Sequence, residues 1–85
     1  MNTRNRRALA DAERLFSIAV NASIGQLRDL IEGMHDDETE KLDNLPEPLQ
    51  EAPSGQCIAD AIEMLEEKLD ALECISEEIE NYFSS

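Results

Sequence analysis

The chain contains two long stretches in which apolar residues recur at steps of three and four. In the second stretch, residues 54–83, the apolar positions are Ile58, Ile62, Leu65, Leu69, Leu72, Ile75, Ile79 and Phe83. This spacing is that of one face of an α-helix, whereas a β-strand alternates at every second residue. Ser54 is the expected N-cap of this helix. Because one amphipathic helix cannot bury its own apolar face, this helix needs a packing partner.

The first stretch, about residues 3–43, supplies a matching helix. Its apolar positions are Ala8, Leu9, Ala12, Leu15, Phe16, Ala19, Val20, Ile24, Leu27, Ile31 and Met34. Thr3 is the expected N-cap. Gly25 and Gly33 each cost roughly 1 kcal/mol relative to alanine inside a helix, and Gly33 is the expected position of any bend. We predict one long helix that ends at about Asp43.

The connection between the two stretches, about residues 44–54, contains all the prolines of the chain, Pro46, Pro48 and Pro53. A helix cannot continue through this cluster, although one turn carrying Leu49 fits between Pro46 and Pro53. A connection of about 11 residues is long enough to reverse the chain. The two helices should therefore lie side by side and antiparallel.

These patterns predict an all-α fold in which residues 1–85 form a single domain. The expected architecture is an antiparallel two-helix hairpin of the coiled-coil type, with helices at about 3–43 and 55–83. A core of this size is small, and both apolar stripes are wider than one pairwise contact can cover. We therefore expect a homo-oligomer, with two hairpins dimerising into a four-helix bundle around Leu65, Leu69 and Leu72.

The position of the turn also predicts which residues face one another. With the turn centred near Leu49, facing positions should have numbers that sum to about 98. This register places Arg28 near Asp70, and Arg14 near Glu80. The first ten residues should project beyond the end of the second helix.

Charge is distributed unevenly along the chain. The net charge is −13, and residues 1–28 hold five arginines against two acids, a net of +3, so the remainder carries −16. Such a surface repels nucleic-acid phosphates, so we expect no direct nucleic-acid contact and a protein partner with a basic surface. The basic start of the chain (Arg4, Arg6 and Arg7) could instead contact nucleic acid, a membrane surface or the acids of another subunit.

The sequence contains no run of about 18 apolar residues and no signal-peptide core, so we expect a cytoplasmic protein that does not contact the membrane. Cys57 and Cys74 lie on one helix at a separation of roughly 25 Å, which is too far for an internal disulfide. We expect both thiols to be reduced, and the alternative is a disulfide between chains.

The most specific surface feature is a row of acids on the second helix, which we call the acidic edge. It consists of Glu63, Glu66, Asp70, Glu73, Glu77 and Glu80. These residues span about 25 Å, and their neighbours are about 5 to 6 Å apart. Such a row could imitate the phosphates of a nucleic-acid strand and bind in the basic groove of another protein. The alternative is an ordinary solvated edge of a helical hairpin.

Catalytic and metal-binding chemistry lacks its usual components. His35 is followed by Asp36, Asp37 and two glutamates, but this spacing matches no metal-binding loop. No serine or cysteine has a basic partner in a recognisable motif, and the chain contains one histidine. We therefore expect no enzyme activity, no metal and no cofactor.

A second group of apolar residues lies partly off the main seam of the hairpin. It consists of Ile18, Ile24, Leu30, Met34 and Met64. We interpret these residues as extra core in a dimer, in preference to a groove for a foreign helix.

The run from Leu27 to Ser85 resembles a group of small acidic helical proteins from bacteria, their phages and other mobile elements. The resemblance rests on DDETEKLDNLPEPLQEAPSGQ and on AIEMLEEKLDALE. That group shares a loop of the form DNLPExLQxSxxG followed by a Glu-rich helix. The resemblance implies a helical hairpin and a mobile-element origin, and it carries no established activity.

Two functions from different classes fit these observations. The first is a protein-interaction module, an inhibitor from a phage or mobile element that binds a host protein as an anti-defence factor or a nucleic-acid mimic. The second is a structural subunit that assembles into a helical oligomer. Binding of a basic protein that weakens with salt would favour the first, and large self-assembly insensitive to salt would favour the second.

Overall fold

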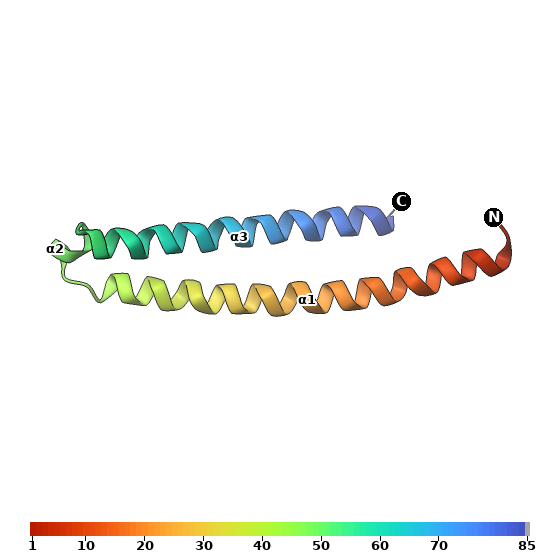
Figure 1. The fold of residues 1–85 in the computed structure, drawn as a ribbon, viewed down its shortest axis with the longest axis horizontal. Coiled ribbons are helices and arrows are strands. Elements are labelled where there is room, and N and C mark those ends of the chain that lie inside the picture. The colour runs from red at the N-terminus through yellow and green to blue at the C-terminus, as the bar shows by residue number, and fades with distance from the viewer. Residues whose placement is uncertain (85) are drawn as a thin grey trace.

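The computed structural model describes residues 1–84, which form three α-helices. Helix α1 spans Thr3–Asp43, α2 spans Glu47–Gln50, and α3 spans Pro53–Ser84. Helices α1 and α3 run antiparallel beside one another, and α2 lies in the turn that joins them (Figure 1). The expected all-helical hairpin is confirmed over these residues, in which there is no strand.

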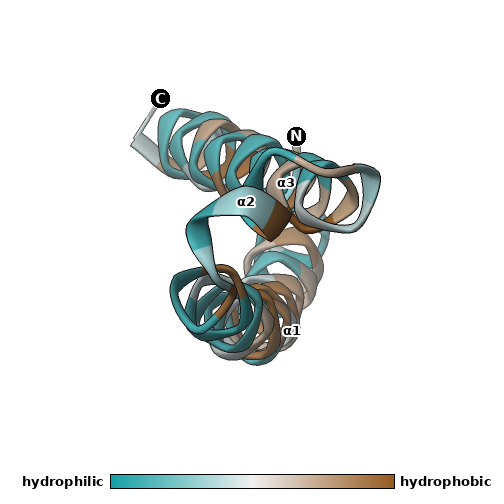
Figure 2. Ribbon diagram, turned by 90° about the vertical axis from the view of Figure 1, so that its left-hand side faces the viewer, coloured by the Kyte–Doolittle hydropathy of each residue, from teal (hydrophilic) through white to brown (hydrophobic). Residues whose placement is uncertain are grey.

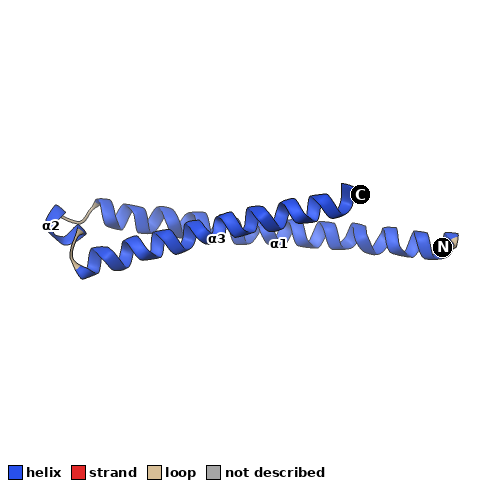
Figure 3. Ribbon diagram, turned by 90° about the horizontal axis from the view of Figure 1, so that it is seen from above, coloured by secondary structure: helices blue, strands red, loops and turns tan. Residues whose placement is uncertain are grey.

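The hairpin is long and thin. Its dimensions are 69 × 17 × 15 Å and its radius of gyration is 19.8 Å, against about 12 Å for a compact domain of this length. The two long helices cross at a shallow angle when seen from above (Figure 3). Because α1 has 41 residues and α3 has 32, the start of α1 projects beyond the end of α3 (Figure 1). We call residues 1–11 the N-terminal overhang.

Helix α1 begins with a cap on Asn2, so the expected cap at Thr3 is wrong. The Oδ1 atom of Asn2 accepts a hydrogen bond from the backbone N–H of Asn5 at 2.8 Å. Asn2 therefore satisfies the backbone donor that a capping side chain usually satisfies, and Thr3 is the first helical residue. Helix α1 then continues without a break through Gly25 and Gly33.

The tip of the hairpin contains the single helical turn expected between the prolines. Helix α2 carries Leu49, and Gln50 closes the turn by donating from Nε2 to the carbonyl oxygen of Leu45 at 2.9 Å. Helix α3 begins at Pro53, so the expected N-cap at Ser54 is wrong. Proline is well placed at a first helical position because its fixed φ suits the helix and the N–H it lacks would have no partner. Ala52 precedes it, and its carbonyl accepts from Gln56 N at 2.9 Å.

Gly55 permits a close approach between α3 and the turn before it. A Cβ atom at this buried position would collide with the backbone carbonyl of Gln50 and would lie 2.6 Å from the carbonyl oxygen of Leu49. Only glycine avoids that contact between backbones. The approach fixes the position at which α3 leaves the tip.

The core of the hairpin is a single narrow seam. Within residues 1–84, the buried apolar side chains are Ile31 and Leu65, with 5% and 6% of their surface exposed, and Leu69 and Leu72 are half-buried. The accessible surface of the chain is 6679 Å², roughly a third more than the ~5,000 Å² of a compact monomer of this mass. The hairpin alone therefore leaves much apolar surface uncovered.

The glycines provide a first test of this fold. Gly55→Ala should lower the free energy of unfolding by about 1 to 3 kcal/mol, because backbone atoms must move to admit the methyl group. Gly33→Ala should raise it by about 0.5 to 1 kcal/mol, because nothing lies within 4 Å of its added Cβ and alanine favours the helix. Denaturant unfolding followed by circular dichroism measures both values. Equal effects of the two substitutions would contradict the tip geometry.

Candidate functional site

The acidic edge lies along the length of α3, and all six of its residues are exposed. Glu66 contacts His35 of α1. The other five, Glu63, Asp70, Glu73, Glu77 and Glu80, form no side-chain hydrogen bond or ion pair within residues 1–84. The α-helix therefore holds five solvated carboxylates in a row, at intervals of three and four residues.

His35 joins the two long helices at the acidic edge. Its Nε2 atom donates a hydrogen bond to Glu66 Oε1 at 3.0 Å, since a carboxylate can only accept, and its side chain is 26% exposed. The sequence pattern indicated only the acidic neighbours of His35, and Glu66 is a partner that it did not indicate. The expected register contained the signal, because 35 and 66 sum to 101. Within residues 1–84, no three His, Cys, Asp or Glu side chains converge as a metal site would require.

The register also places Arg28 beside the acidic edge, as expected. Arg28, Asp70 and Glu73 line one shallow groove between α1 and α3. Arg28 forms no ion pair shorter than 4.0 Å with any described residue. Arg14 lines a groove with Phe83 near the end of α3, and Glu80 lines an adjoining groove that shares Ser17 and Phe83 with it. Arg14 and Glu80 form no ion pair.

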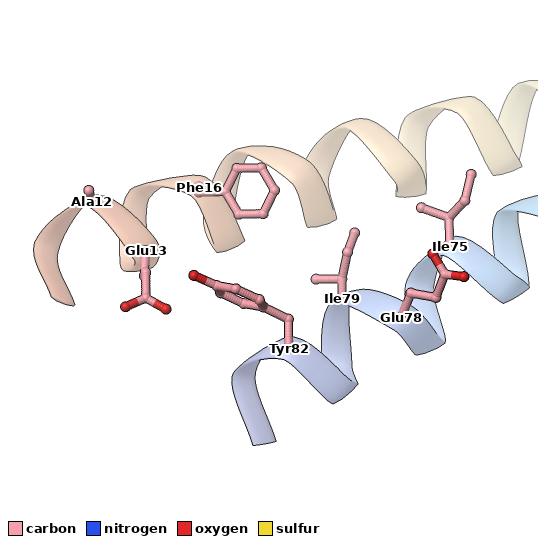
Figure 4. A pocket seen from close by; sticks show the side chains of 7 residues that line it. All are labelled: Ala12, Glu13, Phe16, Ile75, Glu78, Ile79 and Tyr82. Atoms are coloured by element: carbon pink, nitrogen blue, oxygen red, sulfur yellow. The ribbon is translucent and has the colours of Figure 1, made fainter. Parts of the chain in front are cut away.

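On the other side of the hairpin, a largely apolar groove of about 500 Å³ opens between the ends of α1 and α3. Phe16 and Ala12 line it from α1, and Ile75, Ile79 and Tyr82 line it from α3 (Figure 4). Two carboxylates, those of Glu13 and Glu78, stand at this groove. This groove is one part of a longer surface.

We call that longer surface the apolar side of the hairpin. Steps of three, four and seven residues from the groove residues stay on the same side of each helix. The larger apolar members of this series that are exposed are Leu9, Phe16, Leu27, Leu30 and Met34 on α1, and Met64, Ile75 and Tyr82 on α3. The same series also contains exposed polar or charged residues, among them Ser23, Asp37, Lys41, Cys57, Lys68 and Glu78. Figure 2, which looks along the hairpin from its tip, shows hydrophobic and hydrophilic residues on different sides of α1.

The three aromatic residues of the chain gather at the open end of the hairpin. The ring centroids of Phe16 and Phe83 are 6.3 Å apart, and those of Tyr82 and Phe83 are 5.0 Å apart with nearly perpendicular planes. Such edge-to-face contacts are favourable for aromatic rings. This cluster was not predicted, although the expected register contained the signal, because 16 and 83 sum to 99.

Tyr82 also contacts Glu13 across the apolar groove. The hydroxyl of Tyr82 points toward the Glu13 carboxylate (Figure 4). Hydrogen bonding to this carboxylate, and then its negative charge, raise the pKa of the Tyr82 phenol above its ordinary value of 10.0. The contact links the end of α3 to Glu13 of α1.

Cys57 and Cys74 are exposed free thiols. Within residues 1–84, no helix has a stretch long and apolar enough to cross a membrane. Comparisons with protein-family models, with curated proteins and with solved structures found no match. The described residues define the class of fold, which is an elongated helical hairpin with an acidic edge and an apolar side.

Titration of the single tyrosine tests the geometry of the groove. In the unchanged protein, Tyr82 should ionise at a higher pH than a free tyrosine, and Glu13→Gln should bring its pKa back toward 10.0. A raised pKa means that the contact stabilises the fold below pH 10 and is lost as the phenol ionises at higher pH. The ultraviolet absorbance of tyrosinate measures the ionisation directly, because the chain contains one tyrosine and no tryptophan. Identical titrations of the two proteins would show that Glu13 does not reach Tyr82.

Proposed function

We propose that this chain is a small cytoplasmic protein-interaction module that acts by binding rather than by catalysis. In this proposal two copies pair through their apolar sides into a four-helix bundle, and the acidic edge of each copy binds a partner protein with a basic surface. The observation that carries the proposal is the contrast between the two edges of α3. Five carboxylates of one edge are solvated, whereas the other edge is lined mainly by Met64, Ala71, Ile75 and Tyr82.

The acidic edge has the properties that binding to a basic groove requires. Its carboxylates stand on an unbroken helix, so their spacing is fixed before the partner arrives, and little order has to be gained on binding. Opposite charge on the two surfaces would speed association and make it sensitive to salt. Proteins that bind nucleic acid carry such basic grooves. The resemblance to small acidic helical proteins implies a mobile-element origin, and on that ground we propose a host protein as the partner and inhibition as the outcome.

Pairing of two copies is supported by the uncovered apolar surface. Leu30, Met34 and Met64 are exposed although they belong to residue types that are usually buried. Scattered exposed apolar residues are normal, but a continuous series along one side of a hairpin indicates an interface. A second copy offers the same series and can cover it by self-complementarity.

A structural subunit of a larger helical oligomer is the second candidate. Leu15 and Ile18 favour it, because they are 62% and 60% exposed and lie on the face of α1 that points away from the seam at Ile31. Apolar contacts on two sides of one helix could join more than two copies. Assembly of this kind would grow with concentration and would be little affected by salt.

Neutralising the acidic edge tests partner binding. Replacement of Asp70, Glu73 and Glu77 by glutamine should keep the helix, since glutamine is a good helix former, and it leaves the contact between His35 and Glu66 intact. Binding of a fluorescent oligoarginine peptide at low salt should weaken about tenfold or more, and binding of proteins captured from a bacterial lysate should weaken in parallel.

The control for this experiment removes three acids elsewhere. Asp29, Asp60 and Glu67 are exposed and lie outside the acidic edge and outside residues 36–51, so their replacement by glutamine changes the net charge by the same amount. The control should lose only about twofold to threefold, as expected from net charge alone. If the two variants lost the same affinity for the peptide, the acidic edge would be an ordinary solvated surface and not a binding site.

Polar substitutions on the apolar side test self-association. Leu30→Gln with Met34→Gln should shift the protein from dimer toward monomer, because both side chains are exposed in the hairpin and would be buried only between copies. Ile18→Gln is the control and should leave the dimer unchanged, because Ile18 lies about 160° around α1 from Met34 and, contrary to the expectation from the sequence, outside the apolar side. Sedimentation velocity across a concentration series gives the masses. A monomer at all concentrations for the unchanged chain would overturn the pairing, and a loss of mass in the control alone would favour the larger oligomer.

A further inference from the structure

We infer that the two copies of the proposed dimer lie antiparallel, with the N-terminal overhang of each copy against the acidic tip of the other. This inference rests on the proposed pairing through the apolar side and specifies its geometry. We define the acidic tip as residues 36–51, which include the last two turns of α1, the turn itself and α2.

The N-terminal overhang is a positively charged helix end with no helix beside it. Arg4, Arg6 and Arg7 are exposed, and none of them forms an ion pair with a described residue. The one acid in residues 1–11 is Asp11. Asp11 lines the same surface as Arg4 and Arg7 without forming an ion pair with them, so one carboxylate stands against three arginines here. The overhang also exposes Leu9, which belongs to the apolar side.

The acidic tip carries the opposite charge. Residues 36–51 contain seven carboxylates and one cation, Lys41, so their net charge is −6. Lys41 is already bound to Glu38 at 3.0 Å. Six of the carboxylates belong to exposed residues. Leu49 is exposed at the same tip and offers an apolar contact beside the charges.

The apolar side is long enough for a second hairpin to cover it. The 32 residues of α3 extend for about 48 Å along the hairpin. A second copy has the same length and exposes the same apolar residues, so it can cover this side by self-complementarity. A second hairpin is therefore a sufficient occupant.

Charge then selects between the two symmetric ways of placing one apolar side on another. If both tips lie at the same end, two groups of net charge −6 stand together, and the two sets of arginines stand together at the other end. If the tips lie at opposite ends, each overhang lies along the tip of its partner. Like charges in contact disfavour a complex and opposite charges favour it, so the antiparallel dimer is the one that forms.

The antiparallel arrangement also explains why α1 is longer than α3. The overhang of about 11 residues reaches roughly 16 Å past the body of its own hairpin, which is enough to cover the tip of a partner that is shifted along the axis. A two-fold dimer of this kind is closed, since both overhangs and both tips are occupied. Association therefore stops at two copies.

Exchange of charges between the two ends tests the geometry. Arg4→Glu with Arg6→Glu and Arg7→Glu should raise the dimer Kd about tenfold or more at low salt, and so should Asp37→Lys with Glu40→Lys and Asp43→Lys. The six substitutions together should restore the Kd to within about threefold of the unchanged protein. Acids at the start of α1 and lysines at its end both suit the helix dipole, so neither triple variant should weaken the hairpin itself. Thermal unfolding at a concentration where the chain is monomeric checks that point.

Disulfide trapping gives an independent readout of orientation. In a protein with Cys57→Ser and Cys74→Ser, copies carrying Thr3→Cys should cross-link to copies carrying Glu47→Cys under mild oxidation. Neither type should cross-link efficiently to itself. Efficient cross-linking between two copies that both carry Thr3→Cys would overturn the antiparallel arrangement and leave the proposed pairing intact. So would a failure of the variant with all six charge substitutions to regain affinity. A chain that stays monomeric under all conditions would overturn both.

Discussion

Two helices can bury only one seam between them, and the rest of this structure depends on that constraint. In the hairpin the seam closes over Ile31 and Leu65, whereas Leu69 and Leu72 remain half-buried. A helix of more than 30 residues with a stripe wider than one seam must then expose apolar side chains in water. Longer helices therefore bury more apolar area in the seam but also expose more apolar area outside it. The hairpin alone cannot cover that exposed area.

The sequence predicted the hairpin because its signals are local and repeat many times. Apolar residues at steps of three and four determine the two helices, and the proline cluster places the turn, so the bounds of α1 and α3 lie within two residues of those expected. The details that failed depend on single contacts. Whether Asn2 or Thr3 caps α1 is decided by one side-chain rotamer, and the start of α3 at Pro53 is decided by the carbonyl of Ala52.

Contacts across the seam were predictable only as far as the register was applied. The sum of about 98 correctly placed Arg28 beside Asp70, and the same arithmetic points to His35 with Glu66 and to Phe16 with Phe83. The role of Gly55 was not accessible in this way, because it depends on how closely the backbone of α2 approaches α3. The acidic edge was visible in the sequence, whereas its separation from the apolar side required the packing of both helices.

That separation determines how the two surfaces can work together. The acidic edge and the apolar edge of α3 are offset by one or two residues along the helix, so they point to different sides, and covering one leaves the other exposed. The proposed dimer would carry twice the charge of −13, which opposes pairing, and the proposed contact between overhang and tip would offset part of that repulsion locally. Salt screens both effects. It weakens the contact between overhang and tip and the binding of a basic partner, but it relieves the overall repulsion between copies, so self-association should depend on salt less steeply than partner binding.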